Sequence, residues 1–552
     1  MKKTSNILNT SAQALACTVA LFSTSQAATL WTGTTDNTWD EATANWTGGT
    51  ATEYTDGDAV EFSDTTGANT DITIQGGGVT PASVNFTDGG AGANAYVFNS
   101  NSIGGTGALT LDAGFGGSVR FNIGNGYSGG TTVNDGTLII NSAGALGSGT
   151  LTLAGGTVTN VTGGANNVHL TNAVAITGTT SMNVQRNLFF DGAVTGNGTL
   201  NTGGTAEAAS LSFTGDLSGF TGTITHDNVD DDNNTTFSNA VDTSAKFSTS
   251  GDTASSRALR FNGGGTIGEL SGAGGVTVAI GKLTVNQSTD TTYSGKLSNV
   301  SGPMEFEKSG TGSLTLDFAN TYTGGTTLSG GKLIVGNDDA LGAGDVTLTG
   351  GTLHNAVANI RIDNNIIVSG TTAMFAAGNF FVDGAFSGSG TLNAGGNGDG
   401  QTSSSLVISD NLSNFTGTFT HENFNNRNNT TFTTALNTTA KFSTSGNTGG
   451  NRSLHFSAGG TIGELSGTGG KILAKDLTVN QNTDTTYSGH LTNSGTMSLT
   501  KTGTGSLTLD FANTYAGGTT VSAGTLVAAN DKALGNTNLV TVNGGTLDVR
   551  GS

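Results

Sequence analysis

The 552-residue chain contains a single cysteine, Cys17, and only two prolines. One thiol excludes disulfide bonds within the chain and any metal site built from several cysteines. So few prolines exclude a proline-rich linker and a collagen-like repeat. Charged residues make up 11% of the chain, which excludes the highly charged type of disordered protein. No apolar run reaches the roughly 18 residues of a membrane-spanning helix.

Basic residues are also scarce. The chain has 20 Lys and Arg against 40 Asp and Glu, a formal net charge of −20. Nucleic acids and anionic membranes attract proteins through Lys and Arg, so we expect no nucleic acid partner and no anionic membrane as main partner. Glycine, in contrast, is abundant at 90 residues, more than twice the usual share of about 7%.

The first 27 residues are typical of a secretory signal peptide. Two lysines follow the initial Met, residues 14–22 are largely apolar, and the small residues Ser25 and Ala27 suit a signal peptidase. We therefore expect cleavage after Ala27. Cys17 lies within the apolar stretch, and the residues before it are too polar for a lipoprotein signal. The mature chain would then contain no cysteine.

Internal repeats organise the rest of the chain. The string Tyr-x-Gly-Gly-Thr-Thr begins at Tyr127, Tyr322 and Tyr515, and in each copy Leu-Gly and then Gly-Gly-Thr follow at closely matching distances. A longer string, Gly265–Gly272, returns as Gly460–Gly467. Identical strings at such regular spacing indicate a duplication rather than a shared composition.

The repeats divide the chain into five parts. We assign residues 1–27 to the signal peptide, 28–100 to an N-terminal leading or capping segment, 101–321 to a region with the first repeat unit, 322–514 to the second unit and 515–552 to the start of a third. The leading segment has no duplicate. Its tryptophans suit a cap over the first turn of a stacked fold, and they are the only ones in the chain: Trp31, Trp39 and Trp46.

The local pattern predicts strands and tight turns. Short apolar or alternating runs such as Gly136–Asn141 and Gly149–Leu153 end at Gly or Asn, residues that accept the positive φ of tight corners. Helical apolar spacing is missing, so we expect almost no helix. A sandwich array and a coiled parallel sheet both fit. We favour the all-β coil, a parallel solenoid with Leu, Val, Ile and Phe inside, because the turns are too glycine-rich for regular hairpins.

The repeated string resembles a known family. Tyr-x-Gly-Gly-Thr-Thr-[VL]-x-x-Gly-x-Leu-x-[VI], with Ala-Leu-Gly and Gly-Gly-Thr-[LV] after it, is similar to the autotransporter-associated β-strand repeat of Gram-negative passenger regions. The likeness covers about 126–158, 321–353 and 514–547. The tryptophan segment, followed by Asp56–Phe62, also resembles the start of such proteins. The resemblance implies a right-handed parallel β-helix outside the inner membrane, with the repeat assisting passage through the outer membrane.

The sequence departs from that family at its end. A complete autotransporter ends in a membrane β-barrel, whereas this sequence stops soon after the third Gly-Gly-Thr. Because an uncapped solenoid end is a liability, we expect a fragment of a longer protein; a lost anchor is the alternative. The resemblance also implies a secreted or cell-surface location. It implies host or environmental glycans or proteins as partners, and an outer-membrane translocator from missing sequence or another chain.

Two groups of residues invite a chemical interpretation. Asp227 with Asp230-Asp231-Asp232 could form a Ca²⁺ loop, but the second unit has Asn425-Asn426-Arg427 at that place, so we favour a solvated turn. His226-Asp227 and His421-Glu422 could each supply a general base. Neighbours on a strand point to opposite faces, so we favour surface or turn histidines there, and likewise for His169 and His354.

The repeated tyrosines also have two interpretations, a sugar-stacking row or a packing role for each within its own turn. We favour packing, because the three copies lie far apart in the sequence. We expect no catalytic, metal-binding or cofactor-binding residues and no cofactor.

The function we expect is that of an exported structural or interaction protein, adhesive through its Thr- and Asn-rich flank. The alternative is a carbohydrate-active β-helix enzyme, a polysaccharide lyase or hydrolase, which would need two carboxylates within about 10 Å of each other in a groove. A third interpretation is a translocation-helper segment of a larger protein whose activity lies beyond Ser552.

Overall fold

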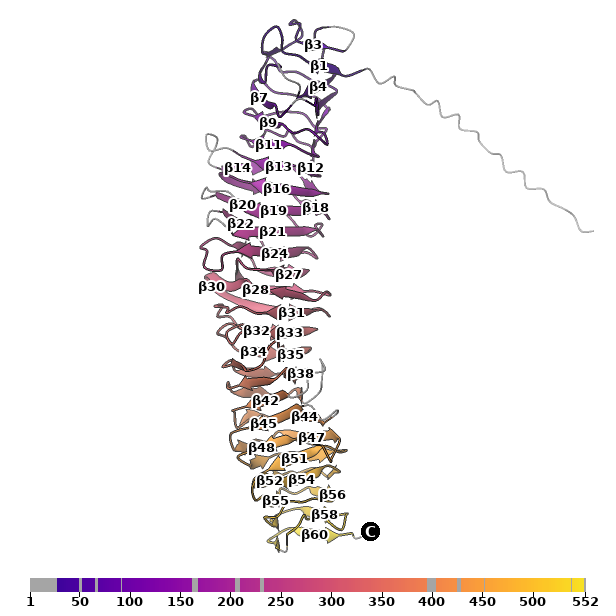
Figure 1. The fold of residues 1–552 in the computed structure, drawn as a ribbon, viewed down its shortest axis with the longest axis vertical. Helices are drawn as coiled ribbons and strands as arrows, with labels where there is room; N and C mark the ends of the chain where they lie inside the picture. The colour runs from indigo at the N-terminus through magenta and orange to yellow at the C-terminus, as the bar shows by residue number, and fades with distance from the viewer. Residues whose placement is uncertain are drawn as a thin grey trace, which may run out of the picture.

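The computed structural model describes residues 27–550 except 49–51, 65–67, 91, 161–166, 204–208, 229–232, 395–403, 424–427, 451 and 538. These residues contain no helix, and therefore none that could cross a membrane. They wind into a parallel β-solenoid of about 21 turns. Figure 1 shows a long, narrow rod along which the chain advances from one end to the other. The predicted all-β parallel coil is confirmed, whereas the expected signal peptide, Ala27 apart, lies outside the described residues.

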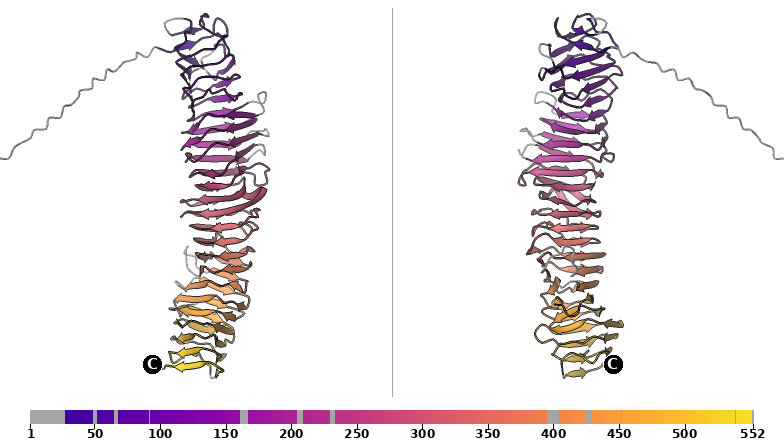
Figure 2. Two further views of the ribbon diagram at one scale, coloured as in Figure 1. Left: turned by 180° about the vertical axis from the view of Figure 1, so that it is seen from behind. Right: turned by 45° about the vertical axis from the view of Figure 1, so that its right-hand side comes forward.

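One face of the rod is a parallel sheet that extends along almost its whole length, from β2 (Thr38–Trp39) to β60 (Thr546–Val549). Each strand between these two ends pairs with the strand one turn before it and the strand one turn after it. Leu333 of β33 (Lys332–Val335), for example, lies between Leu314 and Leu353. Figure 2 shows the same stacking from two further sides. Pairing between successive turns satisfies the backbone groups that a single turn cannot satisfy alone.

The number of faces changes along the rod. Around the repeated tyrosines a turn has two strands, as in β32 (Thr326–Leu328) and β33. A third sheet is added from β14 (Asn167–Leu170) to β30 (Lys296–Ser309), and again from β36 (Ile360–Ile362) to β54 (His490–Asn493). The duplication is therefore visible as two wide regions separated by a narrower, two-faced one.

The interior follows from the alternation of side chains along each strand. In β31 (Ser313–Leu316) the two leucines are buried while Ser313 and Thr315 are partly exposed, because successive side chains of a strand point to opposite faces. The buried apolar residues form a core cluster that extends from Trp31 to Ala533. Full burial of each such side chain contributes about 1.5–3 kcal/mol.

The N-terminal end is closed by an aromatic cluster. Trp31, Trp39 and Trp46 are each at most 2% exposed. The ring centroids of Trp31 and Trp46 lie 5.0 Å apart, and those of Trp39 and Tyr54 lie 5.5 Å apart, both pairs edge to face. β3 (Trp46–Thr47) turns back antiparallel on β1 (Thr29–Trp31). The predicted tryptophan cap is confirmed.

Candidate functional site

The tyrosine of each repeated string lies inside the rod. Tyr127, Tyr322 and Tyr515 are at most 1% exposed. The phenol of each shares a hydrogen bond with the threonine four residues later, and the two oxygens are 2.7 Å apart for Tyr127 and Tyr515. Desolvation raises the pKa of all three phenols, that of Tyr515 to about 12. The packing interpretation is confirmed, because a buried ring offers no sugar-stacking face.

The glycine of the Leu-Gly pair in each string is required by that tyrosine. Gly342 has a φ of 67°, a conformation that residues with a Cβ rarely adopt. A Cβ on Gly342 would lie 2.7 Å from the Tyr322 ring, which is closer than packed atoms allow. Only glycine therefore permits this turn to close over the ring.

An asparagine two residues before each tyrosine connects three turns. Asn320 is 5% exposed; its Oδ1 accepts from the Leu297 amide at 2.7 Å and its Nδ2 donates to the Ala340 carbonyl at 2.6 Å. Asn125 and Asn513 make the equivalent pairs of bonds. The sequence analysis missed this asparagine clamp, although Asn-x-Tyr precedes Gly-Gly-Thr-Thr in all three copies.

Two lysines are buried just before the tyrosine strings. Lys308 and Lys501 lie inside the rod, and each is 0% exposed. The Lys308 ammonium donates to the Ser309 carbonyl at 2.5 Å, and that of Lys501 donates to the Thr502 carbonyl at 2.6 Å. Burial lowers the pKa of both, that of Lys308 to about 8.

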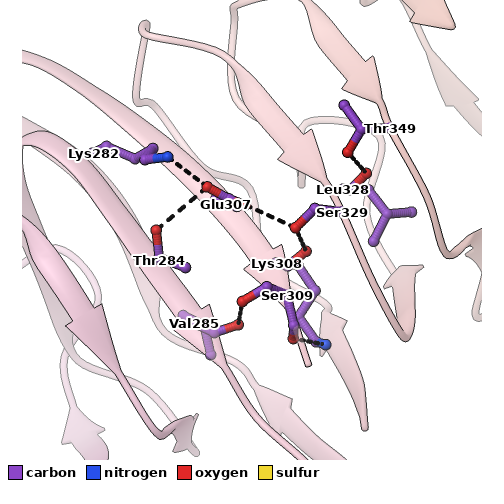
Figure 3. Close-up of polar contacts among 9 residues, drawn as sticks. All are labelled: Lys282, Thr284, Val285, Glu307, Lys308, Ser309, Leu328, Ser329 and Thr349. Atoms are coloured by element: carbon purple, nitrogen blue, oxygen red, sulfur yellow. Dashed lines mark hydrogen bonds and ion pairs between the residues drawn. The ribbon is translucent and has the colours of Figure 1, made fainter. Parts of the chain in front are cut away.

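The residue beside Lys308 has the opposite environment, as Figure 3 shows. Glu307 lies on the outer surface, where its carboxylate accepts from Lys282 Nζ and Ser329 Oγ at 2.7 Å each. Burial raises the pKa of Glu307, but these donors outweigh it and hold the pKa below the usual value. The contacts of Glu307 with Lys282 and Ser329 join three successive turns of the rod. Lys308, in contrast, donates hydrogen bonds to carbonyl groups of its own turn.

The histidines of the wide regions contradict one expectation. His226 and His421 are 1% and 0% exposed, so the prediction of surface or turn histidines is wrong. His226 Nδ1 lies 3.0 Å from Thr235 Oγ1, and His421 Nδ1 lies 3.2 Å from Thr430 Oγ1. Burial lowers the pKa of both imidazoles to about 4. Their acidic neighbours face outward, as the alternation predicted, and no acid–base pair forms.

The other two histidines differ from each other. His354 is 5% exposed, so its predicted surface position is also wrong. His169 is exposed as expected; it stacks on Phe189 with ring centroids 4.2 Å apart, and its Nδ1 lies 2.8 Å from Asp191. In the second unit Arg361 takes this role: it lies over the Phe381 ring and pairs with Asp383. Each group connects the first strand of a third sheet, β14 or β36, to the next strand.

Carboxylates gather at one cavity of the described surface. A cavity of about 400 Å³ is lined by Asp338, Asp339, Asp363 and Arg361, among others. Asp338 accepts the Arg361 amide at 2.8 Å. No group of three or more His, Cys, Asp or Glu in the described chain is arranged to hold a metal ion. The acidic string Asp230–Asp232 lies outside the described residues.

Comparisons with known proteins agree with this architecture. The family described as Passenger-associated-transport-repeat matches residues 104–140, 306–335 and 499–528. Over 127 residues the chain is 39% identical to the adhesin BmaC autotransporter of Brucella suis biovar 1 (strain 1330). The chain carries three copies of this passenger-associated repeat. The match covers 22% of this chain and 4% of that adhesin, so it spans a small part of the relative's length. No solved structure matches the chain.

The matched segments show what the passenger-like repeat does in three dimensions. Each begins before the tyrosine string and includes the preceding strand, which in the second and third copies carries Lys308 and Lys501. Each segment also contains the tyrosine, the asparagine clamp and the Gly-Gly-Thr-Thr turn. Asparagine, tyrosine and lysine bond to neighbouring turns or to their own turn. The buried residues of the repeat therefore close each turn and hold it against its neighbours. Any binding function must come from residues on the outer surface.

Proposed function

We propose that the chain is the exported, cell-surface part of an adhesive passenger, a rigid rod that holds a hydroxyl- and amide-rich surface away from the cell. The observation that carries the proposal is the segregation of polar groups. The repeat uses its tyrosine, lysine and asparagine inside the rod, which leaves the hydroxyl and amide groups of the outer surface for binding. The matched relative is named an adhesin, which favours adhesion over catalysis.

The repeat has a second proposed role, in passage through the outer membrane. Strand pairing in the rod joins successive turns, so a chain that emerges end first can add one turn at a time to those already folded. Absence of disulfides from the mature chain suits threading through a pore. We propose that the translocator is supplied by further sequence or by another chain, and that nucleic acid is not a partner.

An adhesion assay tests the first role. Beads carrying the purified chain are compared with beads carrying albumin for retention on epithelial monolayers under flow. Retention of the first beads only, and its loss in competition with free chain, is the expected result. Equal retention of both bead types would refute an adhesive function.

A surface-delivery assay tests the second role. The full chain is fused to an autotransporter β-barrel and exported from a Gram-negative host, and accessible chain is measured with antibody on intact cells. Asn320→Ala should reduce the amount that reaches the surface, whereas Asn187→Ala on the outer surface should not. Equal delivery of both variants would contradict a role for the repeat in translocation.

A further inference from the structure

A small cavity on the third sheet of the first unit differs in charge from the rest of this acidic rod. It has a volume of about 200 Å³ and lies where the loop before β25 (Leu259–Phe261) meets β28 (Val276–Asn286) and β30. Two cations line it, Arg260 and Lys296, together with several hydroxyl groups and one amide. No carboxylate belongs to this lining, although the chain has twice as many acidic as basic residues.

The guanidinium of Arg260 is held in place by neutral acceptors. Its Nε donates to Asn234 Oδ1 at 2.7 Å and its Nη2 donates to the Ser256 carbonyl at 3.1 Å. Burial lowers the pKa of Arg260, and the nearby Arg257 adds to the effect. A fixed cation without a carboxylate on it is prepared to receive an anion from outside.

The floor of the cavity is apolar. Val276 and Val278 are each 6% exposed and form, with Ala258, a small cluster that is separate from the main core and has Val300 packed against it. These side chains point outward from the sheet rather than into the rod. An apolar floor beside hydroxyl, amide and cationic groups suits a ligand with a C–H face, hydroxyl groups and an acidic group.

The second unit repeats the arrangement with other cations. Val276 pairs with Lys296 in the first unit, and at the equivalent register Lys471 pairs with His490. His455 takes the place of Arg260, opposite Leu473 as Arg260 is opposite Val278. Burial lowers the pKa of His455 and of His490, and Lys475 and Lys471 respectively add to the effect. Both imidazoles are therefore neutral near pH 7, and the positive charge at this place belongs to Lys471 and Lys475, which lie close to them.

We propose that this surface in each unit is a binding site for an acidic sugar residue, a hexuronate or a sulfated sugar, of a polysaccharide. The proposal deepens the adhesive function by naming a class of partner, and its site stands on the lining described above. Arg and Lys pair with the carboxylate or sulfate, and the valine floor packs on the ring. About 200 Å³ is below the 300–1,000 Å³ of typical ligand pockets, which fits one residue of a polymer.

The overall negative charge is compatible with this ligand. At physiological ionic strength charges are screened beyond about 8 Å, so the cations lining the site, rather than the net charge of the rod, set the local potential. The two sites belong to different units, far apart along the rod, and each has few cations. This arrangement favours isolated acidic groups over the closely spaced phosphates of a nucleic acid.

Calorimetric titration of the purified chain tests the proposal. The probes are oligogalacturonate, a heparin-derived oligosaccharide, neutral dextran and a single-stranded DNA oligomer. We expect one or both acidic oligosaccharides to bind at two sites per chain, with no binding of dextran. The two acidic probes separate carboxylate from sulfate recognition. Failure of both to bind, or equal binding of dextran or DNA, would overturn the proposal.

Variants locate the site. Arg260→Gln combined with Lys296→Gln should reduce the stoichiometry from two sites to one, or weaken one site by at least tenfold. Val278→Glu tests the floor without removing a cation and should have the same effect. The control is Lys246→Gln, because Lys246 pairs with Glu269 on the continuous face. Circular dichroism and thermal unfolding establish that each variant is folded; unchanged stoichiometry and affinity in the folded variants would refute the assignment.

The titration and the bead assay fail independently. Binding of acidic sugar in solution without bead retention would refute the adhesive function and leave the site assigned. Bead retention without sugar binding would refute the site and leave adhesion to another surface.

Discussion

Replacing Asn320 with alanine tests whether the asparagine clamp holds neighbouring turns together. The variant removes an acceptor from the Leu297 amide and a donor from the Ala340 carbonyl. The Asn320 side chain is 5% exposed, so water does not readily replace either partner. An unsatisfied buried group costs about 1–3 kcal/mol, and the two together should cost about 2–6 kcal/mol of local stability.

Hydrogen exchange followed by mass spectrometry measures this effect where it occurs. Because each turn contacts mainly its neighbours, stability along a solenoid is close to a sum of local terms. Since about 1.4 kcal/mol corresponds to a factor of ten, amides around Leu297–Ala340 should exchange about 30- to 20,000-fold faster. The clamps at Asn125 and Asn513 should keep their protection, which makes them controls within the same molecule.

A matched surface variant completes the test. Asn187 is partly exposed, and its Nδ2 donates to Asn167 on the outer surface at 3.0 Å. Asn187→Ala should change exchange by less than about fivefold, because water can satisfy the exposed partner. Unchanged exchange in Asn320→Ala would refute the clamp, and a uniform acceleration along the whole rod would refute the additive description of its stability.

Three further predictions follow from the buried and outer groups. Burial holds the pKa of His226 and His421 near 4, below the ordinary value of about 6.5. The unfolded chain therefore binds more protons between those values, and stability should fall as the pH falls from 6.5 to 4, by up to about 3 kcal/mol per histidine; thermal unfolding at both pH values should show a smaller loss when each histidine is replaced by leucine. Gly342→Ala should cost about 1–3 kcal/mol through backbone strain and more through its clash with the tyrosine ring, whereas Gly281→Ala, also at positive φ but with open space around it, should show the strain alone in the same melts. Incubation with neutral and acidic polysaccharides should release no new reducing ends or unsaturated uronates; cleavage that is lost in Asp363→Asn would instead establish the enzyme.

The stacked fold could be predicted from the sequence because its strongest signals are local and repeated. Short runs ending in Gly or Asn predict strands and corners, and strings that recur at matching distances predict equivalent turns. The tryptophan cap could be predicted for a similar reason, since large rings in a segment without a duplicate suit the end of a stack. The third sheet could not be predicted, because it depends on how each corner folds rather than on any string.

The buried polar residues were missed although a signal for them exists. Side chains two residues apart on a strand share a face. Ile224 therefore predicts a buried His226, and Phe306 predicts a buried Lys308. The residue types predicted exposed positions instead, because histidine and lysine are seldom fully buried. The strands of this rod carry threonine on both faces. A large apolar residue two positions away therefore predicts the burial of a polar residue better than the residue type does.

The outer cations could not be grouped without knowing the length of each turn. Arg260 and Lys296 lie on strands that each pair with β28, yet they are far apart in the sequence. The low number of basic residues suggests that such residues are scattered over the chain. Only the pairing of β25 and β30 with β28 shows that Arg260 and Lys296 lie close together.

Comparison of the two units separates what the rod requires from what its surface is free to change. Some groups that bond within the stack are the same in both units, such as Gln287 and Gln481, whose Nε2 atoms each lie within hydrogen-bond distance of three groups at equivalent places. Outer groups have changed, as His169 has become Arg361 and Val276 has become Lys471. A duplicated rod can therefore present two different surfaces on one scaffold. Exchanging outer residues between the units should alter binding while thermal unfolding stays the same, and a large fall in stability would show that the surface also belongs to the scaffold.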